Sequence, residues 1–100
     1  MRRILAQKQV VSDLEEQKEA REHDTEAIFD DQQRLRENMK ALKGSAEEKS
    51  LVQRYTQQLN EQENRLEALR KEVSKIGKQA EDAQAVLDRM IQEMSFDVKL

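Results

Sequence analysis

The feature that most constrains the fold is a hydrophobic repeat with alternating three- and four-residue spacing between residues 52 and 94. Twelve of its thirteen positions are apolar or aromatic. A spacing that averages 3.5 residues keeps such a stripe on one side only where helices wind around each other. The repeat therefore predicts a coiled-coil helix. Its positions are Val52, Tyr55, Leu59, Gln62, Leu66, Leu69, Val73, Ile76, Ala80, Ala83, Leu87, Met90 and Met94.

A second repeat with the same spacing occupies the first part of the chain, so two helical segments are expected to pack together. Its ends are largely apolar and its middle is polar. The positions are Ile4, Gln7, Val11, Leu14, Lys18, Arg21, Thr25, Ile28, Gln32, Leu35, Met39 and Leu42.

Between the two repeats, signals for a helix end and a helix start stand side by side. Gly44 suits the position just past a helix end, where a left-handed backbone is needed. Ser45 suits an N-cap, and Glu48 three residues later completes a capping box. The second stripe also lies one residue earlier than a continuation of the first, a swing of about 100° on a single helix. We therefore predict a first helix at 1–43, a turn at 44–46 and a second helix at 47–94.

The predicted fold class is all-α: a long antiparallel helical hairpin, with dimerisation into a four-helix assembly as an extension. The alternative is one continuous helix in a parallel coiled-coil dimer that serves as a stalk or zipper. Two antiparallel pairings fit the stripes, one with facing residue numbers that add to about 94 and one with numbers that add to about 90 or 91. The first sets Leu35 opposite Leu59 and the second sets it near Tyr55. The tight turn favours the second, but the sequence leaves both open.

Composition supports an extended helical structure and argues against several classes of partner. Charged residues make up 39% of the 100 residues, aromatic residues only 3%, and there is no proline. The net charge is −3 with both signs mixed throughout, so no basic stripe for nucleic acid is expected. The mixed signs also disfavour a membrane-surface helix, which prefers a basic polar face. No apolar run approaches the roughly 20 residues that span a bilayer.

The polar middle of the first repeat faces an apolar stretch of the second, and this mismatch has two interpretations. Lys18 and Arg21 can cover the apolar stripe with their stems while their charged groups reach water. Alternatively, a second copy of the chain or another helical protein segment covers it. In that case Lys18, Arg21 and Phe29, which lies outside the repeat, would belong to a second interface.

No constellation for catalysis, cofactor binding or metal binding is expected. The chain has no cysteine, and its single histidine, His23, has only Glu19 one turn before it as a second ligand, whereas a zinc site needs three or four. Gly77 interrupts the second helix, as a tolerated imperfection, a point where a neighbouring backbone approaches closely, or a local bend. The tail at 95–100 changes to a two-residue alternation, which predicts an extended or frayed end.

Parts of the sequence resemble a known family. The run IFDDQQRLRENMKAL at residues 28–42, Arg54-Tyr55 with the following Leu59, Gln62-Glu63 and Leu66, and the Ser-Phe-Asp of residues 95–97 carry the resemblance. They are similar to the C-terminal helical region of uncharacterised bacterial proteins related to the mucoidy-inhibitor family, over about residues 25–70. The resemblance implies a helical extension of a larger bacterial protein with a preceding β-rich domain. It implies no enzymatic activity and no catalytic residue.

The sequence thus favours a non-enzymatic spacer or protein-interaction module that associates with itself or with another helical segment. No cofactor, small-molecule substrate, nucleic acid or membrane is expected as a partner. The predicted helix–helix seam consists of Ile28, Leu35, Met39, Leu42, Val52, Tyr55, Leu59, Leu66, Leu69, Val73 and Ile76.

Overall fold

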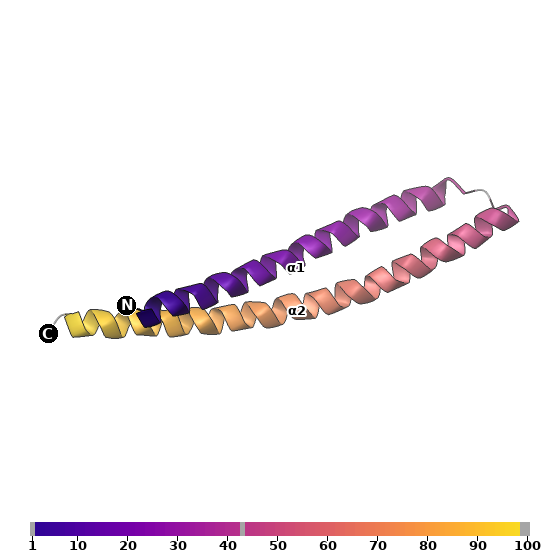
Figure 1. Cartoon of the computed structure of the whole chain (residues 1–100). Helices are drawn as coiled ribbons and strands as arrows, with labels where there is room; N and C mark the ends of the chain where they lie inside the picture. The colour runs from indigo at the N-terminus through magenta and orange to yellow at the C-terminus, as the bar shows by residue number, and fades with distance from the viewer. Residues whose placement is uncertain (1, 43, 99–100) are drawn as a thin grey trace. The chain divides into compact units, whose positions relative to one another are not determined.

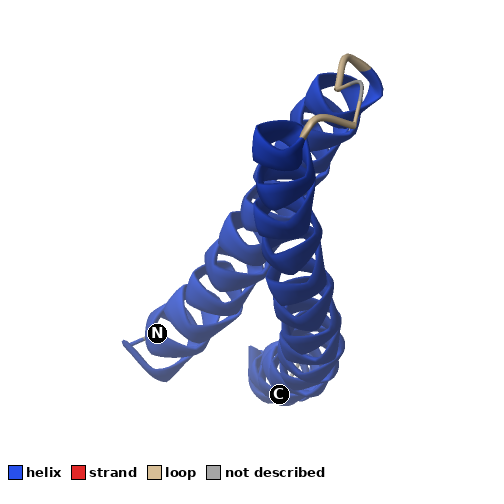
Figure 2. Ribbon diagram, turned by 90° about the vertical axis from the view of Figure 1, so that its right-hand side faces the viewer, coloured by secondary structure: helices blue, strands red, loops and turns tan. Residues whose placement is uncertain are grey.

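Two long helices make up the computed structural model, which describes residues 2–42 and 44–98, with side chains as far as Ser95. Helix α1 spans Arg2–Lys40 and helix α2 spans Ala46–Val98, with a short connection between them (Figure 1; tan in Figure 2). No strand occurs in these described ranges. The predicted all-α helical hairpin is confirmed. The alternative of one continuous helix is wrong, because the chain leaves the helix after Lys40 and starts a new one at Ala46.

The connection forms through the local chemistry that the sequence indicates. Helix α1 tightens at its end, where the amides of Ala41 and Leu42 donate to the carbonyl groups three residues earlier, at 3.3 and 3.2 Å. Gly44 then takes a φ of 92°, a left-handed conformation that costs glycine little because it has no Cβ. Ser45 starts α2, since its Oγ accepts a hydrogen bond from the amide of Glu48 at 3.1 Å.

The element boundaries differ from the predicted ones at both ends of the second helix and at the end of the first. Helix α1 stops at Lys40 rather than at residue 43. After Lys40 the backbone amides bond to carbonyl groups three residues earlier instead of four, which ends the regular α-helix. Residue 43 lies outside the described residues. Ala46 already belongs to α2, since Ser45 supplies its N-cap.

The prediction of an extended or frayed tail from residue 95 is wrong for the part that the structure describes. Helix α2 continues through Ser95 to Val98. Serine costs a helix only a fraction of a kcal/mol, and neither glycine nor proline follows it, so nothing in the sequence stops the helix there. The last two residues of the predicted tail, 99 and 100, lie outside the described residues.

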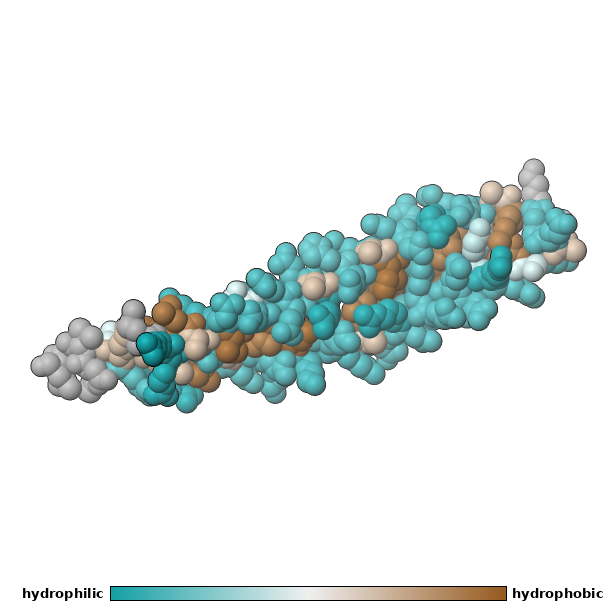
Figure 3. All heavy atoms as spheres, viewed as in Figure 1, coloured by the Kyte–Doolittle hydropathy of each residue, from teal (hydrophilic) through white to brown (hydrophobic). Residues whose placement is uncertain are grey.

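The chain divides into two compact units, each of which pairs a segment of α1 with a segment of α2. The turn unit is Glu22–Lys71 and contains the connection. The terminal unit combines Met1–Arg21 with Glu72–Leu100. Within both units hydrophobic side chains gather between the helices, and hydrophilic ones cover the outside (Figure 3). A single apolar stripe per helix is therefore enough to form each core.

Candidate protein-interaction site

The predicted seam residues lie between the helices in both units. Leu35 and Leu69 are fully buried in the turn unit, and Ile76 is buried in the terminal unit. The remaining predicted seam residues are partly buried: Ile28, Met39, Leu42, Val52, Tyr55, Leu59, Leu66 and Val73. A two-helix seam can hide its central residues completely and its flanking ones only in part, because no third element covers the sides.

The terminal unit has a core of its own that the predicted seam did not include. Val11, Ala83 and Leu87 are buried together, and Ile4 and Leu14 pack against them. All five occupy positions of the three- and four-residue repeats, so the signal was present in the sequence. The polar residues at 18, 21 and 25 separate this group from the rest of the first repeat and make it easy to overlook.

The turn unit contains a polar layer across its seam. Gln32 is only 2% exposed, and its Nε2 donates to Oε1 of Glu63 at 3.0 Å. On the opposite side, Nε2 of Gln62 donates to Oδ2 of Asp31 at 2.6 Å. We call these four residues, together with Arg34, the polar layer. It joins α1 to α2 by two hydrogen bonds between side chains that are 31 residues apart in sequence.

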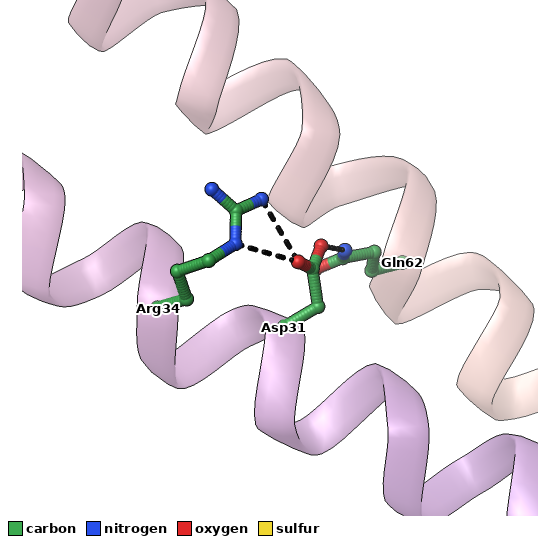
Figure 4. A network of polar contacts seen from close by, with 3 residues as sticks. All are labelled: Asp31, Arg34 and Gln62. Carbon is green, nitrogen blue, oxygen red and sulfur yellow. Dashed lines mark hydrogen bonds and ion pairs between the residues drawn. The ribbon is translucent and has the colours of Figure 1, made fainter.

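Arg34 completes the layer from the next turn of α1. Its Nε and one terminal nitrogen lie 2.9 and 2.8 Å from Oδ1 of Asp31, while Gln62 approaches the other carboxylate oxygen from α2 (Figure 4). These hydrogen bonds, first from Arg34 and then from Gln62, hold the pKa of Asp31 below its ordinary value of 3.8. Asp31 is therefore ionised at neutral pH and accepts bonds from both helices.

The polar layer decides between the two pairings that the sequence left open. Both inter-helix hydrogen bonds of this layer join residues whose numbers add to within one of 94, which is the register that sets Leu35 opposite Leu59 in the turn unit. That register places Gln32 and Gln62 opposite each other. The other would set Gln32 opposite Leu59 and leave the glutamine amide without a polar neighbour, at a cost of about 1–3 kcal/mol.

The polar layer is not fully satisfied. Oε1 of Gln62 is buried and accepts no hydrogen bond from the described residues. A buried carbonyl oxygen of this kind lowers the stability relative to an apolar pair. The layer is thus better explained by its effect on register than by a large contribution to stability.

Lys18 and Arg21 lie across the seam of the terminal unit rather than beside an uncovered stripe. The aliphatic end of Lys18 reaches the surface of Gly77, where its Cε lies 3.9 Å from the position of a Cβ. Nε of Arg21 lies 3.5 Å from Oε2 of Glu72. Ile76, which lies between Glu72 and Gly77 in the sequence, is buried. These contacts match the interpretation in which long stems cover the apolar stripe and charged ends reach water.

Phe29, the third residue of the predicted second interface, belongs to the turn unit and is 55% exposed. The structure thus places it in a different unit from Lys18 and Arg21. Only Phe29 of the three presents an exposed apolar surface.

The contact between Lys18 and residue 77 does not by itself explain why residue 77 is a glycine. A Cβ at residue 77 would meet Lys18 at an ordinary van der Waals distance, so the close approach does not require glycine. Gly77 instead lines a shallow groove of about 430 Å³ in the terminal unit. Its walls come from both helices: Glu15, Lys18, Gly77, Ala80, Glu81, Gln84, Ala85 and Asp88.

Within the described residues, no group of three or more histidine, cysteine or carboxylate side chains could hold a metal ion. Nδ1 of His23 lies 3.9 Å from Oε2 of Glu26, and both side chains are exposed. In the same part of the chain, neither helix has a stretch long and apolar enough to cross a bilayer.

Comparisons with protein-family models, curated proteins and solved structures find no match to this chain. The resemblance to the mucoidy-inhibitor family therefore stays a prediction from the sequence, and the candidate site must be interpreted from its own geometry.

Proposed function

We propose that the chain is a non-enzymatic spacer and protein-interaction module that associates with a second copy of itself. The observation that carries this proposal is the amount of surface that the two helices leave uncovered. The chain exposes 7982 Å², whereas a compact monomeric protein of 11.8 kDa exposes about 5,900 Å². Burial of about 800 Å² per copy, which is less than half of this excess, would reach the size of a specific dimer interface.

The exposed apolar side chains support association through one unit in particular. Six large hydrophobic residues of the described part are exposed: Leu5, Val10, Phe29, Val86, Ile91 and Met94. Five of them belong to the terminal unit, and Phe29 alone belongs to the turn unit. Scattered apolar residues are normal on a protein surface, but a concentration in one unit is typical of an interaction surface.

The mixed charge of the surface favours a protein partner. The chain carries 18 basic and 21 acidic residues, so a second copy is repelled only weakly by the net charge of −3. A nucleic acid or an anionic membrane would gain little from the same surface, because their binding depends on an excess of basic groups.

The direct test is the molar mass in solution, measured by light scattering over a concentration series, with helix content followed by circular dichroism. We expect a mass of twice 11.8 kDa at high concentration that falls on dilution. A mass of 11.8 kDa at every concentration, with full helix content, would contradict self-association. Sedimentation with anionic vesicles and a low-salt gel-shift assay serve as controls, and both are expected to be negative.

A further inference from the structure

Helix α1 has a second face in the turn unit, beside the one that forms the seam. Each of its positions comes directly after a position of the first repeat, which is about 100° further around the helix. The positions therefore keep the same three- and four-residue spacing and form one continuous face. All of them are exposed, so the seam does not cover them. We call this face the α1 outer face; it consists of Glu22, Glu26, Phe29, Gln33, Arg36 and Lys40.

The charges of the α1 outer face are separated along the helix. Its first two residues, Glu22 and Glu26, are acidic, and its last two, Arg36 and Lys40, are basic. A glutamine and Phe29 lie between them, and Phe29 is 55% exposed. This face thus has a negative end, an aromatic centre and a positive end, although the chain as a whole mixes both signs.

This order of charges is unfavourable within a single helix. The two acidic residues are four apart in the sequence, and so are the two basic ones, and like charges at this spacing destabilise a helix. Elsewhere in the turn unit the same spacing joins opposite charges, as where Nζ of Lys71 lies 3.7 Å from Oε1 of Glu67. The contact of Glu26 with Nδ1 of His23, at 3.9 Å, is exposed on both sides and is therefore weak. A partner with the reversed order of charges would offset the repulsion at both ends of the face.

The α1 outer face complements itself when it is reversed. If two copies of the face run antiparallel about a twofold axis near residue 31, each acidic residue of one copy faces a basic residue of the other. The facing residues have numbers that add to 62: Glu22 with Lys40, Glu26 with Arg36, and Phe29 with Gln33. The symmetry repeats each pair, so four ion pairs can form. Phe29 of each copy lies about 3 Å from the axis along the helix, at the centre of the contact.

We infer that the α1 outer face is the contact surface of a symmetric antiparallel dimer, in which the acidic end of one copy binds the basic end of the other and Phe29 lies at the centre. The partner is thus a second copy of this chain. A twofold interface needs a self-complementary surface in which residue i meets j and j meets i, and the reversed order of charges meets this requirement. An aromatic centre with a charged rim is also the usual composition of a specific interface.

The inference rests on the proposed self-association, but its driving force differs from that of the terminal unit. The exposed residues that support association there are apolar, whereas the α1 outer face has one aromatic residue among charged ones. The contact is about 27 Å long, so the dimer should be weak and depend on concentration. Salt should weaken it further, because the screening length falls from about 10 Å at 0.1 M to about 3 Å at 1 M.

The test reverses one charge at a time in the full chain. The Glu26→Arg variant places basic side chains opposite each other in the dimer, and the Arg36→Glu variant places acidic ones opposite each other. Each reversal acts twice because of the symmetry, so each variant alone should have a dissociation constant at least about tenfold higher than the natural chain at low salt. Mixed in equal amounts, the two variants should associate with each other about as tightly as the natural chain does. In the mixed dimer, positions 26 and 36 again carry opposite charges at both contacts.

The helix itself should tolerate both reversals. Each variant gains an opposite charge four residues away, from Glu22 or from Lys40, and both positions are exposed. Circular dichroism should therefore show the helix content of the natural chain. The matched controls are Asp24→Arg and Arg54→Glu, which change the net charge by the same amounts at exposed positions of the turn unit outside the α1 outer face. Neither control should change the dissociation constant.

The molar mass by light scattering over a concentration series separates the outcomes. Association that is lost in each variant and restored in their mixture is the expected result. Association that is lost in both and not restored would refute the antiparallel pairing. A dimer that neither reversal weakens, but that Ile91→Gln does, would refute the α1 outer face and leave self-association through the terminal unit. A natural chain that is monomeric at every concentration would refute the proposed function as well.

Discussion

Replacement of each of the two glycines by alanine should shift the stability of the chain in opposite directions. Gly77 lies in the interior of α2, where a Cβ would meet only Cε and Nζ of Lys18, at 3.9 and 4.0 Å. These are ordinary contacts, so the new methyl group fits without movement of the backbone. Glycine in a helix interior is about 0.8–1 kcal/mol less favourable than alanine. Gly77→Ala should therefore raise the free energy of unfolding by about 1 kcal/mol.

Gly44 differs from Gly77 in that its backbone conformation, rather than the space around it, favours glycine. No heavy atom lies within 4 Å of a Cβ placed there, so space is not limiting. Its φ of 92° is, however, a conformation that costs an L-residue about 1–2 kcal/mol. Alanine recovers roughly 0.4–1 kcal/mol by restricting the unfolded chain. Gly44→Ala should therefore lower the free energy of unfolding by up to about 1.6 kcal/mol.

The assay is urea and thermal unfolding followed by circular dichroism, at a concentration where light scattering gives the monomer mass. The two variants should differ by about 2 kcal/mol in stability, which corresponds to roughly 8–16 °C in Tm for a chain of this length. The Gly44→Asn variant is a matched control, since asparagine tolerates the left-handed conformation better than alanine and should lose less. If Gly44→Ala proves as stabilising as Gly77→Ala, the argument from the left-handed turn is refuted.

Three further predictions concern the seam and the polar layer. Leu35→Ala should lower the free energy of unfolding by about 2–5 kcal/mol, because Leu35 is fully buried. Loss of the helix signal at 25 °C in moderate urea would show this destabilisation. An effect below 1 kcal/mol would mean that the seam is not formed in solution. The double variant Gln32→Leu with Gln62→Leu should raise stability by about 1–2 kcal/mol but allow a second register, which distances between spin labels on α1 and α2 would detect as two populations rather than one. Because the folded-state pKa of Asp31 is lowered, its bonds stabilise the fold above about pH 4 and are lost as the pH falls through that lowered value. At 40% exposure this amounts to about 0.5 kcal/mol or less, and the urea midpoints of the natural chain and Asp31→Asn should differ more at pH 7 than at pH 2.5.

Much of the architecture was predictable from local signals. The three- and four-residue repeats specify which side of each helix is apolar, because side-chain direction along a helix depends only on position. Gly44 and Ser45 specify where the chain turns, since one tolerates a left-handed backbone and the other caps the next helix. The end of α2 was misjudged because three alternating residues carry too little information to outweigh a helix that nothing interrupts.

The register between the helices was not predictable in the same way. Both pairings match apolar stripes equally well, and in the turn unit the contacts among Asp31, Gln32, Gln62 and Glu63 distinguish them. Hydrogen bonds are directional and short, so they select one alignment where apolar contact tolerates several. The placement of Lys18 and Arg21 opposite an apolar stretch of α2 was likewise ambiguous. The sequence does not reveal where a long, flexible side chain lies.

The sequence by itself determined that this chain forms two helices, where the chain turns, and which helix faces meet. These properties follow from residue type and from spacing along the chain. Only the tertiary structure decided which residues of α1 lie opposite which residues of α2, that Lys18 covers Gly77, and that a groove opens beside it. These properties depend on contacts between residues far apart in the chain, and their energies are set by distances that no local pattern encodes.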